Sequence, residues 1–168
     1  TVDGLGNLRY RQRLSTMRQT RDAQIMRNSL FIGLLVGLAT GVWMWTEFAL
    51  GLHSESTDIG RLTGFLSIVF PIAGLAVALR RSRANTGYLT YRSGTPHVLA
   101  VCSGAATTSS LMSGIYILWL NPGWLSKAGI TAAEFIAQGA LAALIGGILV
   151  GIIVLGLLRS RPSQGTSR

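Results

Sequence analysis

Four long apolar runs constrain this chain more than any other feature of its sequence. They cover about residues 30–52, 62–79, 98–120 and 135–158, and each is 18 to 24 residues long. About 20 apolar residues allow an α-helix to cross the hydrocarbon core of a bilayer. Because backbone groups in lipid must find hydrogen-bond partners within the protein, each run is predicted to be a helix. We therefore expect an all-α fold, an integral membrane four-helix bundle that occupies residues 29–159.

The second run is the shortest of the four and contains a proline. Pro71 removes one backbone N–H donor from a helix and can bend it. A kink or a re-entrant path is therefore an alternative for this run, although Arg61 and Arg80 mark polar ends on either side. We count the run as a membrane span.

Little of the chain remains outside the apolar runs. Hydrophobic residues make up 49% of the sequence and charged residues only 12%, which places the chain outside the soluble globular class. Residues 1–28 form a basic cytoplasmic arm, in which Leu14, Met17 and Ile25 recur at roughly helical spacing and allow an amphipathic helix on the lipid surface. Residues 160–168 form a polar basic tail.

Positive charges are distributed unevenly around the apolar runs. Segments 1–29, 80–96 and 159–168 hold 13 of the 15 Lys and Arg residues, whereas the other two loops hold only Arg61 and Lys127. Loops rich in Lys and Arg stay on the cytoplasmic side of a membrane. We therefore expect a multi-pass protein of the bacterial cytoplasmic (inner) membrane with a cytoplasmic N-terminus and a cytoplasmic C-terminus. An even number of spans requires both termini to lie on one side, and both termini are basic.

Residue patterns typical of catalysis are missing from the sequence. It contains no phosphate-binding loop, dinucleotide fingerprint or zinc-protease motif. Glu47 and Glu134 lie near the ends of apolar runs and are interpreted as interfacial carboxylates, with a proton relay through Glu47 as the less favoured alternative. Cys102, the single cysteine, is interpreted as a small buried hydrophobe. The chain is predicted not to be an enzyme and to hold no metal site.

Two histidines are candidates for binding a cofactor. His53 follows the first run and His97 begins the third, so they lie on opposite sides of the predicted membrane and cannot share one metal ion. A neutral imidazole can be the axial ligand of a haem or of a chlorophyll-type pigment. His97 is the cofactor-binding candidate, weighed against a structural role at the interface, which is favoured.

Small residues at four-residue spacing are the most informative pattern within the apolar runs. They let helix backbones approach closely in lipid, where no hydrophobic force drives helices together. The third run instead carries hydroxyl residues between Ser103 and Ser113, which can pack against other helices or line a narrow polar path; packing is favoured. The predicted helix-packing residues are Gly33, Gly37, Gly41, Gly60, Gly64, Gly147 and Gly151.

The arginines admit three interpretations. They can determine topology, attach to anionic lipid headgroups, or dock another membrane subunit. Nucleic acid is not expected as a partner, because no aromatic or motif context accompanies the charges. The residues predicted to dock lipid or a partner are Arg9, Arg11, Arg13, Arg18, Arg21, Arg80, Arg81 and Arg83.

Short motifs along the apolar runs indicate a family. They are FIGLLVGLATG at 31–41, GYLTYRSG at 87–94, SGIYILWLNPGWL at 113–125, and a glycine-rich final run followed by Arg159. In these motifs the region from about residue 28 to 160 resembles the bacterial family called domain of unknown function 4199, which consists of small four-helix membrane proteins. The resemblance implies a topology but no activity, catalytic residue or cofactor. The Arg-rich arm departs from the family pattern.

Three hypotheses for function follow. The leading one is a non-catalytic structural or accessory subunit within a larger membrane complex, of respiratory or photosynthetic type, because helix-packing signals are abundant. The first alternative is a small oligomeric transporter or channel that uses the hydroxyl residues of the third run and the break at Pro71. The second is a pigment- or haem-binding subunit with His97 as ligand. The expected partners are other integral membrane subunits and anionic lipids, including bound lipid.

Overall fold

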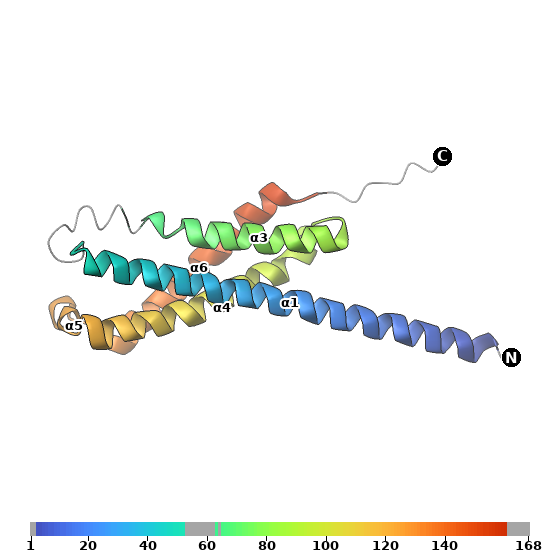
Figure 1. The fold of residues 1–168 in the computed structure, drawn as a ribbon, viewed down its shortest axis with the longest axis horizontal. Coiled ribbons are helices and arrows are strands. Elements are labelled where there is room, and N and C mark those ends of the chain that lie inside the picture. The colour runs from blue at the N-terminus through green and yellow to red at the C-terminus, as the bar shows by residue number, and fades with distance from the viewer. Residues whose placement is uncertain (1–2, 53–62, 64, 161–168) are drawn as a thin grey trace.

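Most of the described part of the chain is helical. The computed structural model describes residues 3–52, 63 and 65–160. Within them, an isolated bridge between Leu89 and Ser160 is the sole β-type pairing. The helices are α1 (Asp3–Ala49), α3 (Val69–Thr86), α4 (Tyr91–Ile115), the π-helical turn η1 (Tyr116–Leu120), α5 (Gly123–Ala128) and α6 (Ala132–Leu158) (Figure 1).

Three helices among the described residues are long and apolar enough to cross a membrane. They are Asp22–Ala49 within α1, Tyr91–Leu120 formed by α4 with η1, and Ala132–Leu158 of α6. The prediction of an all-helical membrane protein is confirmed. The helix α3 does not meet the same standard, because three of its 18 residues are arginines in its last two turns.

The helices differ in extent from the second and third apolar runs. The run 62–79 is interrupted by a turn at residues 67–68, and α3 then continues past its predicted end to Thr86. Pro71 lies in the first turn of α3, where its missing N–H breaks no helical hydrogen bond. The third run begins at Tyr91, because a capping box between Thr90 and Ser93 starts the helix there. A polar cap sets the start of α4, which hydropathy does not detect.

One continuous helix joins the predicted arm to the first span. No break occurs near residue 28, because α1 runs from Asp3 to Ala49. A helix of 47 residues is about 70 Å long, more than twice the hydrocarbon thickness. Figure 1 shows the N-terminal part of α1 extending beyond the ends of the other helices.

Consecutive long helices alternate in direction. The N-terminal half of α1, the α3–α4 turn and the end of α6 lie at one end of the bundle, and α5 lies at the other (Figure 1). Gly87 closes α3 with a φ of 78°, a left-handed conformation that glycine adopts at low cost. A second capping box, between Thr131 and Glu134, starts α6.

The central helix is α4, which contacts α1 and α6 most extensively. The buried core includes Leu75 and Leu79 from α3, Val98 and Val101 from α4, and Leu155 from α6. Dispersion contacts among these side chains hold α3 and α6 against α4.

Glycines bring the backbones of α1 and α4 into direct contact. A Cβ at Gly33 would overlap with the backbone of Val101, and one at Gly37 would overlap with the carbonyl oxygen of Ala105. Gly104 contributes from the opposite side, because a Cβ there would lie 2.5 Å from the carbonyl oxygen of Leu30. The double GxxxG of the first run is therefore covered by α4 of the same chain.

Gly37→Ala is expected to lower the free energy of unfolding by about 1–3 kcal/mol, the usual range for overpacking a tight contact. The added methyl group would push α1 away from the Ala105 carbonyl oxygen. Unfolding of the purified chain in mixed detergent, titrated with SDS and followed by circular dichroism, measures the effect. Gly139→Ala is the matched control, because a Cβ at Gly139 meets no atom within 4 Å. Equal stability of the two variants would contradict the packing described.

Candidate functional site

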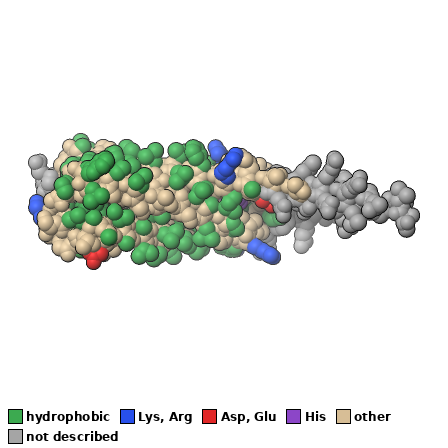
Figure 2. Space-filling view, turned by 90° about the horizontal axis from the view of Figure 1, so that it is seen from below, with side chains coloured by type: hydrophobic (Ala, Val, Ile, Leu, Met, Phe, Trp, Pro, Cys, Tyr) green, Lys and Arg blue, Asp and Glu red, His purple; other side chains and the backbone are tan. Residues whose placement is uncertain are grey.

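The surface of the bundle is apolar between its two ends. Figure 2 shows hydrophobic side chains spread over the middle of this face, with Lys, Arg, Asp and Glu side chains towards the ends. Trp119 and Leu157 are each 80% exposed. The α6 span is the least covered, since 17% of its most apolar window is buried within the chain against 28% for the other two spans. Lipid or other membrane chains must cover this surface.

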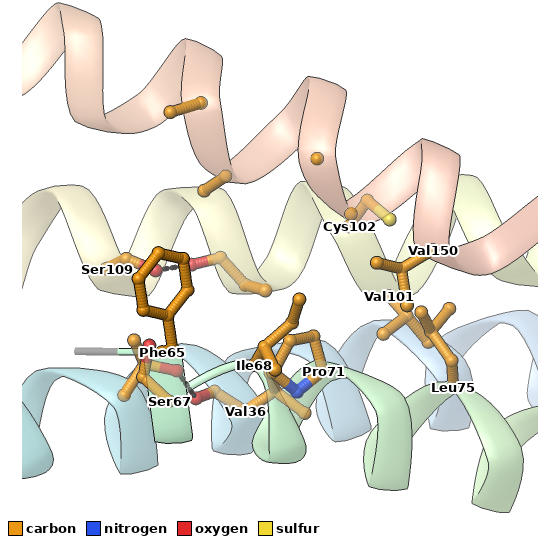
Figure 3. A pocket seen from close by; sticks show the side chains of 16 residues that line it. Val36, Phe65, Ser67, Ile68, Pro71, Leu75, Val101, Cys102, Ser109 and Val150 are labelled. Atoms are coloured by element: carbon orange, nitrogen blue, oxygen red, sulfur yellow. Dashed lines mark hydrogen bonds between the residues drawn. The ribbon is translucent and has the colours of Figure 1, made fainter. Parts of the chain in front are cut away.

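A partly open groove of about 350 Å³ lies between α3 and α6, with α4 and α1 at its floor (Figure 3). We call it the central groove. Bulky side chains from α3 and its preceding turn form one wall, and small residues of α6 form the other. The principal lining residues are Val36, Phe65, Ile68, Pro71, Leu75, Val101, Cys102, Ser109, Ala142, Ala143, Gly146 and Gly147.

Hydroxyl groups in and near the central groove are engaged by their own helices. Thr40 donates to the carbonyl oxygen of Val36 at 3.0 Å, and Ser109 donates to that of Ala105. Outside the groove, Ser110 of α4 donates to the Ala106 carbonyl at 2.7 Å. Among the described residues, no charged side chain lines the groove. The groove is therefore suited to apolar surfaces rather than to a hydrated polar solute.

The predicted packing glycines on α1 and α6 contact other helices of the same chain. Gly41 faces Met112, Gly147 faces the Sγ of Cys102 at 2.9 Å from its would-be Cβ, and Gly151 faces Val98. Gly60 and Gly64 lie outside the described residues.

Two glycines of α6 meet no other helix, and the sequence reasoning did not single them out. A Cβ at Gly139 or at Gly146 would have no neighbour within 4 Å, and Gly146 lines the central groove. The spacing Ala142-x-x-x-Gly146 was the available signal. This small-residue surface is open, whereas similar surfaces on α1 are closed by α4.

His97 lies in the second turn of α4, buried against α1. It is 9% exposed, and its Nδ1 lies 3.0 Å from the Oγ of Ser29. The Ser29 hydroxyl also lies 3.2 Å from the Ile25 carbonyl oxygen, and the tautomer of His97 sets which of the two side chains donates in the Ser29–His97 hydrogen bond. His97 lines neither the central groove nor the smaller cavity between α1 and α3, so neither holds a planar macrocycle against its imidazole.

Glu47 is more buried than an interfacial carboxylate would be. Its side chain is 5% exposed and accepts a 2.9 Å hydrogen bond from the Nε1–H of Trp43. The same indole N–H lies 3.3 Å from the carbonyl oxygen of Thr63. Trp43 thus ties the end of α1 to the segment that leads into α3, and Glu47 accepts from the same indole. Within the described part of the chain, no group of three metal-ligating side chains gathers around it or elsewhere.

The described arginines gather at the end of the bundle that contains the α3–α4 turn. Arg80, Arg81 and Arg83 are exposed on the last turns of α3. Arg159 lies 5.6 Å from the centre of the Tyr91 ring, a cation–π contact that sequence reasoning did not foresee. The side chains of Arg9, Arg11, Arg13, Arg18 and Arg21 lie outside those described, although their backbone belongs to α1.

No family model matches the chain, and neither a curated protein nor a solved structure matches it. The resemblance to domain of unknown function 4199 therefore stays a prediction.

Removing either member of the Ser29–His97 pair is expected to cost about 1–3 kcal/mol, because the other member is left buried without its partner. The variants Ser29→Ala and His97→Ala and the double variant form a cycle. The double variant should be more stable than the sum of the two single effects predicts, with a coupling of about 0.5–3 kcal/mol. SDS-titrated unfolding of the four proteins measures it. Strictly additive effects would show that the hydrogen bond contributes nothing to stability.

Proposed function

We propose that this chain is a non-catalytic structural subunit of a larger membrane protein complex, in which the central groove receives a transmembrane helix of another subunit. One observation carries the proposal. The small-residue wall of α6 at Ala142, Ala143 and Gly146 is open, while the glycine surface of α1 is closed by α4 of the same chain. The class of complex that we propose as its host is respiratory or photosynthetic.

The chemistry of the groove favours a helix as its occupant. Small residues at four-residue spacing permit the backbone of a second helix to approach within lipid. The bulky wall around Ile68 and Pro71 offers gaps into which side chains of a partner helix can insert. Because the lining hydroxyls of Thr40 and Ser109 already donate to their own helices, apolar contact dominates.

The proposal includes a topology of four crossings with both termini in the cytoplasm of a bacterial cell. In this topology, α3 crosses together with the residues that precede it, although its own apolar part is short. The alternating helix directions support four crossings, since the N-terminal part of α1 and the end of α6 lie towards the same end of the bundle (Figure 1). The arginines at that end support its cytoplasmic location.

The two alternative functions receive less support from the described residues. For a transporter or channel, the hydroxyls of Thr107 and Ser110 would have to face a permeant solute, yet both donate to carbonyl oxygens of α4. For pigment or haem binding, His97 would have to present a ring nitrogen to a cavity. Its Nδ1 is engaged by Ser29, and the ring lines neither cavity between the helices.

Gly146→Leu is expected to abolish co-purification of the chain with its partner subunits while leaving its own fold intact. The leucine side chain would fill the central groove, yet its Cβ meets no atom of the chain within 4 Å. The tagged chain is extracted in mild detergent, and its partners are quantified by mass spectrometry.

Ala137→Leu is the matched control for this experiment, because it adds the same side chain at an exposed position on the opposite face of the same helix, outside the groove. It should retain a stoichiometric set of partners. A wild-type chain that purifies alone, or equal loss of partners in both variants, would refute the groove as the subunit contact.

The topology is tested by single cysteines placed in a Cys102→Ala background and labelled with a membrane-impermeant maleimide. The exposed sites are Gln24, Ala84 and Ser126. In intact cells we expect labelling of Ser126→Cys alone, and labelling of Gln24→Cys and Ala84→Cys only after permeabilisation. Labelling of Ala84→Cys with protection of Gln24→Cys would show that α3 does not cross, and the reverse pattern at all three sites would invert the orientation.

A further inference from the structure

A second cavity lies between α1 and α3 at the arginine-bearing end of the bundle. It has a volume of about 270 Å³ and is separate from the central groove. From α1 it is lined by Ile25, Asn28, Ser29 and Ile32, and from α3 by Ala78, Arg81, Ala84 and Asn85. None of the functions considered above uses this cavity.

The polar side of the cavity is built to bind an anion. Arg81 contributes a guanidinium group, whose planar set of N–H donors matches two oxygens of a phosphate. Asn28 and Asn85 also line the cavity. Among the described residues, no carboxylate lines the cavity, and Arg81 makes no ion pair. The charge of Arg81 is therefore not neutralised by a described side chain.

The other side of the cavity is apolar. Ile25, Ile32 and Ala78 line it, and Ile32 lies one turn inside the first long apolar run. The cavity is thus lined by a cationic side chain, Arg81, and by apolar side chains that continue into the membrane-spanning part of α1. A ligand that fits both sides carries a phosphate at one end and acyl chains at the other.

We propose that this cavity binds the headgroup of an anionic phospholipid, with Arg81 as the principal ligand of its phosphate. A zwitterionic lipid fits less well, because no described acidic side chain lines the cavity to receive an ammonium group. The neighbouring Arg80 and Arg83 add positive potential to the same end of α3 and further favour a net negative headgroup. Basic pockets between transmembrane helices on the cytoplasmic side are established sites for such headgroups.

The bound lipid would also connect two helices that share little contact. The helix α3 packs far less extensively on α1 than α4 does. A phosphate held by Arg81 of α3 and by Asn28 of α1 would bridge them at the membrane surface. The lipid site does not depend on the proposal that the chain is a subunit, since it lies at a different place in the bundle.

Native mass spectrometry of the purified full chain, titrated with phosphatidylglycerol or with phosphatidylcholine, tests the site. Wild type should retain phosphatidylglycerol more strongly. Arg81→Gln should weaken that binding about tenfold, as expected for the loss of a charge-assisted contact. Arg80→Gln is the matched control, because it removes the same charge one residue away without touching the cavity, and it should change binding less than about twofold.

Ala84→Trp tests whether lipid binding depends on the space in the cavity rather than on charge. It fills the space between α1 and α3 at an exposed position and leaves the net charge unchanged, so lipid retention should also fall about tenfold. Circular dichroism checks that both variants keep their helices.

Three results would overturn the proposal. Equal losses in Arg81→Gln and Arg80→Gln would indicate general charge attraction, and unchanged binding in Ala84→Trp would place the lipid elsewhere. Displacement of the lipid by equimolar inorganic phosphate would indicate a site for the free anion.

Discussion

The close approach of α1 and α4 is the contact on which the rest of the bundle depends. In lipid, helices associate through packing rather than through the exclusion of water, so the tightest fit determines the arrangement. Gly33 and Gly37 of α1 and Gly104 of α4 remove the side chains that would otherwise separate the two backbones. The helix α1 packs on one side of α4, and α6 packs on another side of α4 through Gly147 and Gly151.

This central position of α4 explains both cavities. The remaining helix, α3, makes limited contact with each of the other three long helices. It therefore leaves a space towards α6, the central groove, and another towards α1, the cavity that contains Arg81. One space is apolar and lies beside small residues, whereas the other is basic and lies at the end of the bundle. The difference follows from the sequence of α3, which is apolar at Pro71 and cationic after Leu79.

For much of the candidate site, the sequence predicted which residues take part but not how they are arranged. Apolar run length predicted long helices at α1, α4 and α6, and glycine spacing predicted the packing role of Gly33, Gly37 and Gly151. Neither signal distinguishes a glycine that is covered by its own chain from one that is left open, such as Gly146. That distinction depends on which helix lies opposite, and the sequence of one helix carries no information about its neighbour.

The sequence by itself determined that this is a helical membrane protein whose charges gather at the helix ends, because hydrocarbon excludes unpaired backbone and charged groups at any position along a span. The tertiary structure determined how those helices pack against one another. It buried His97 on Ser29, placed Arg81 and Asn28 around the same cavity, and left the Cα of Gly146 open towards the groove. These outcomes depend on the rotation and register of packed helices, which arise from contacts between residues far apart in the chain and not from local composition.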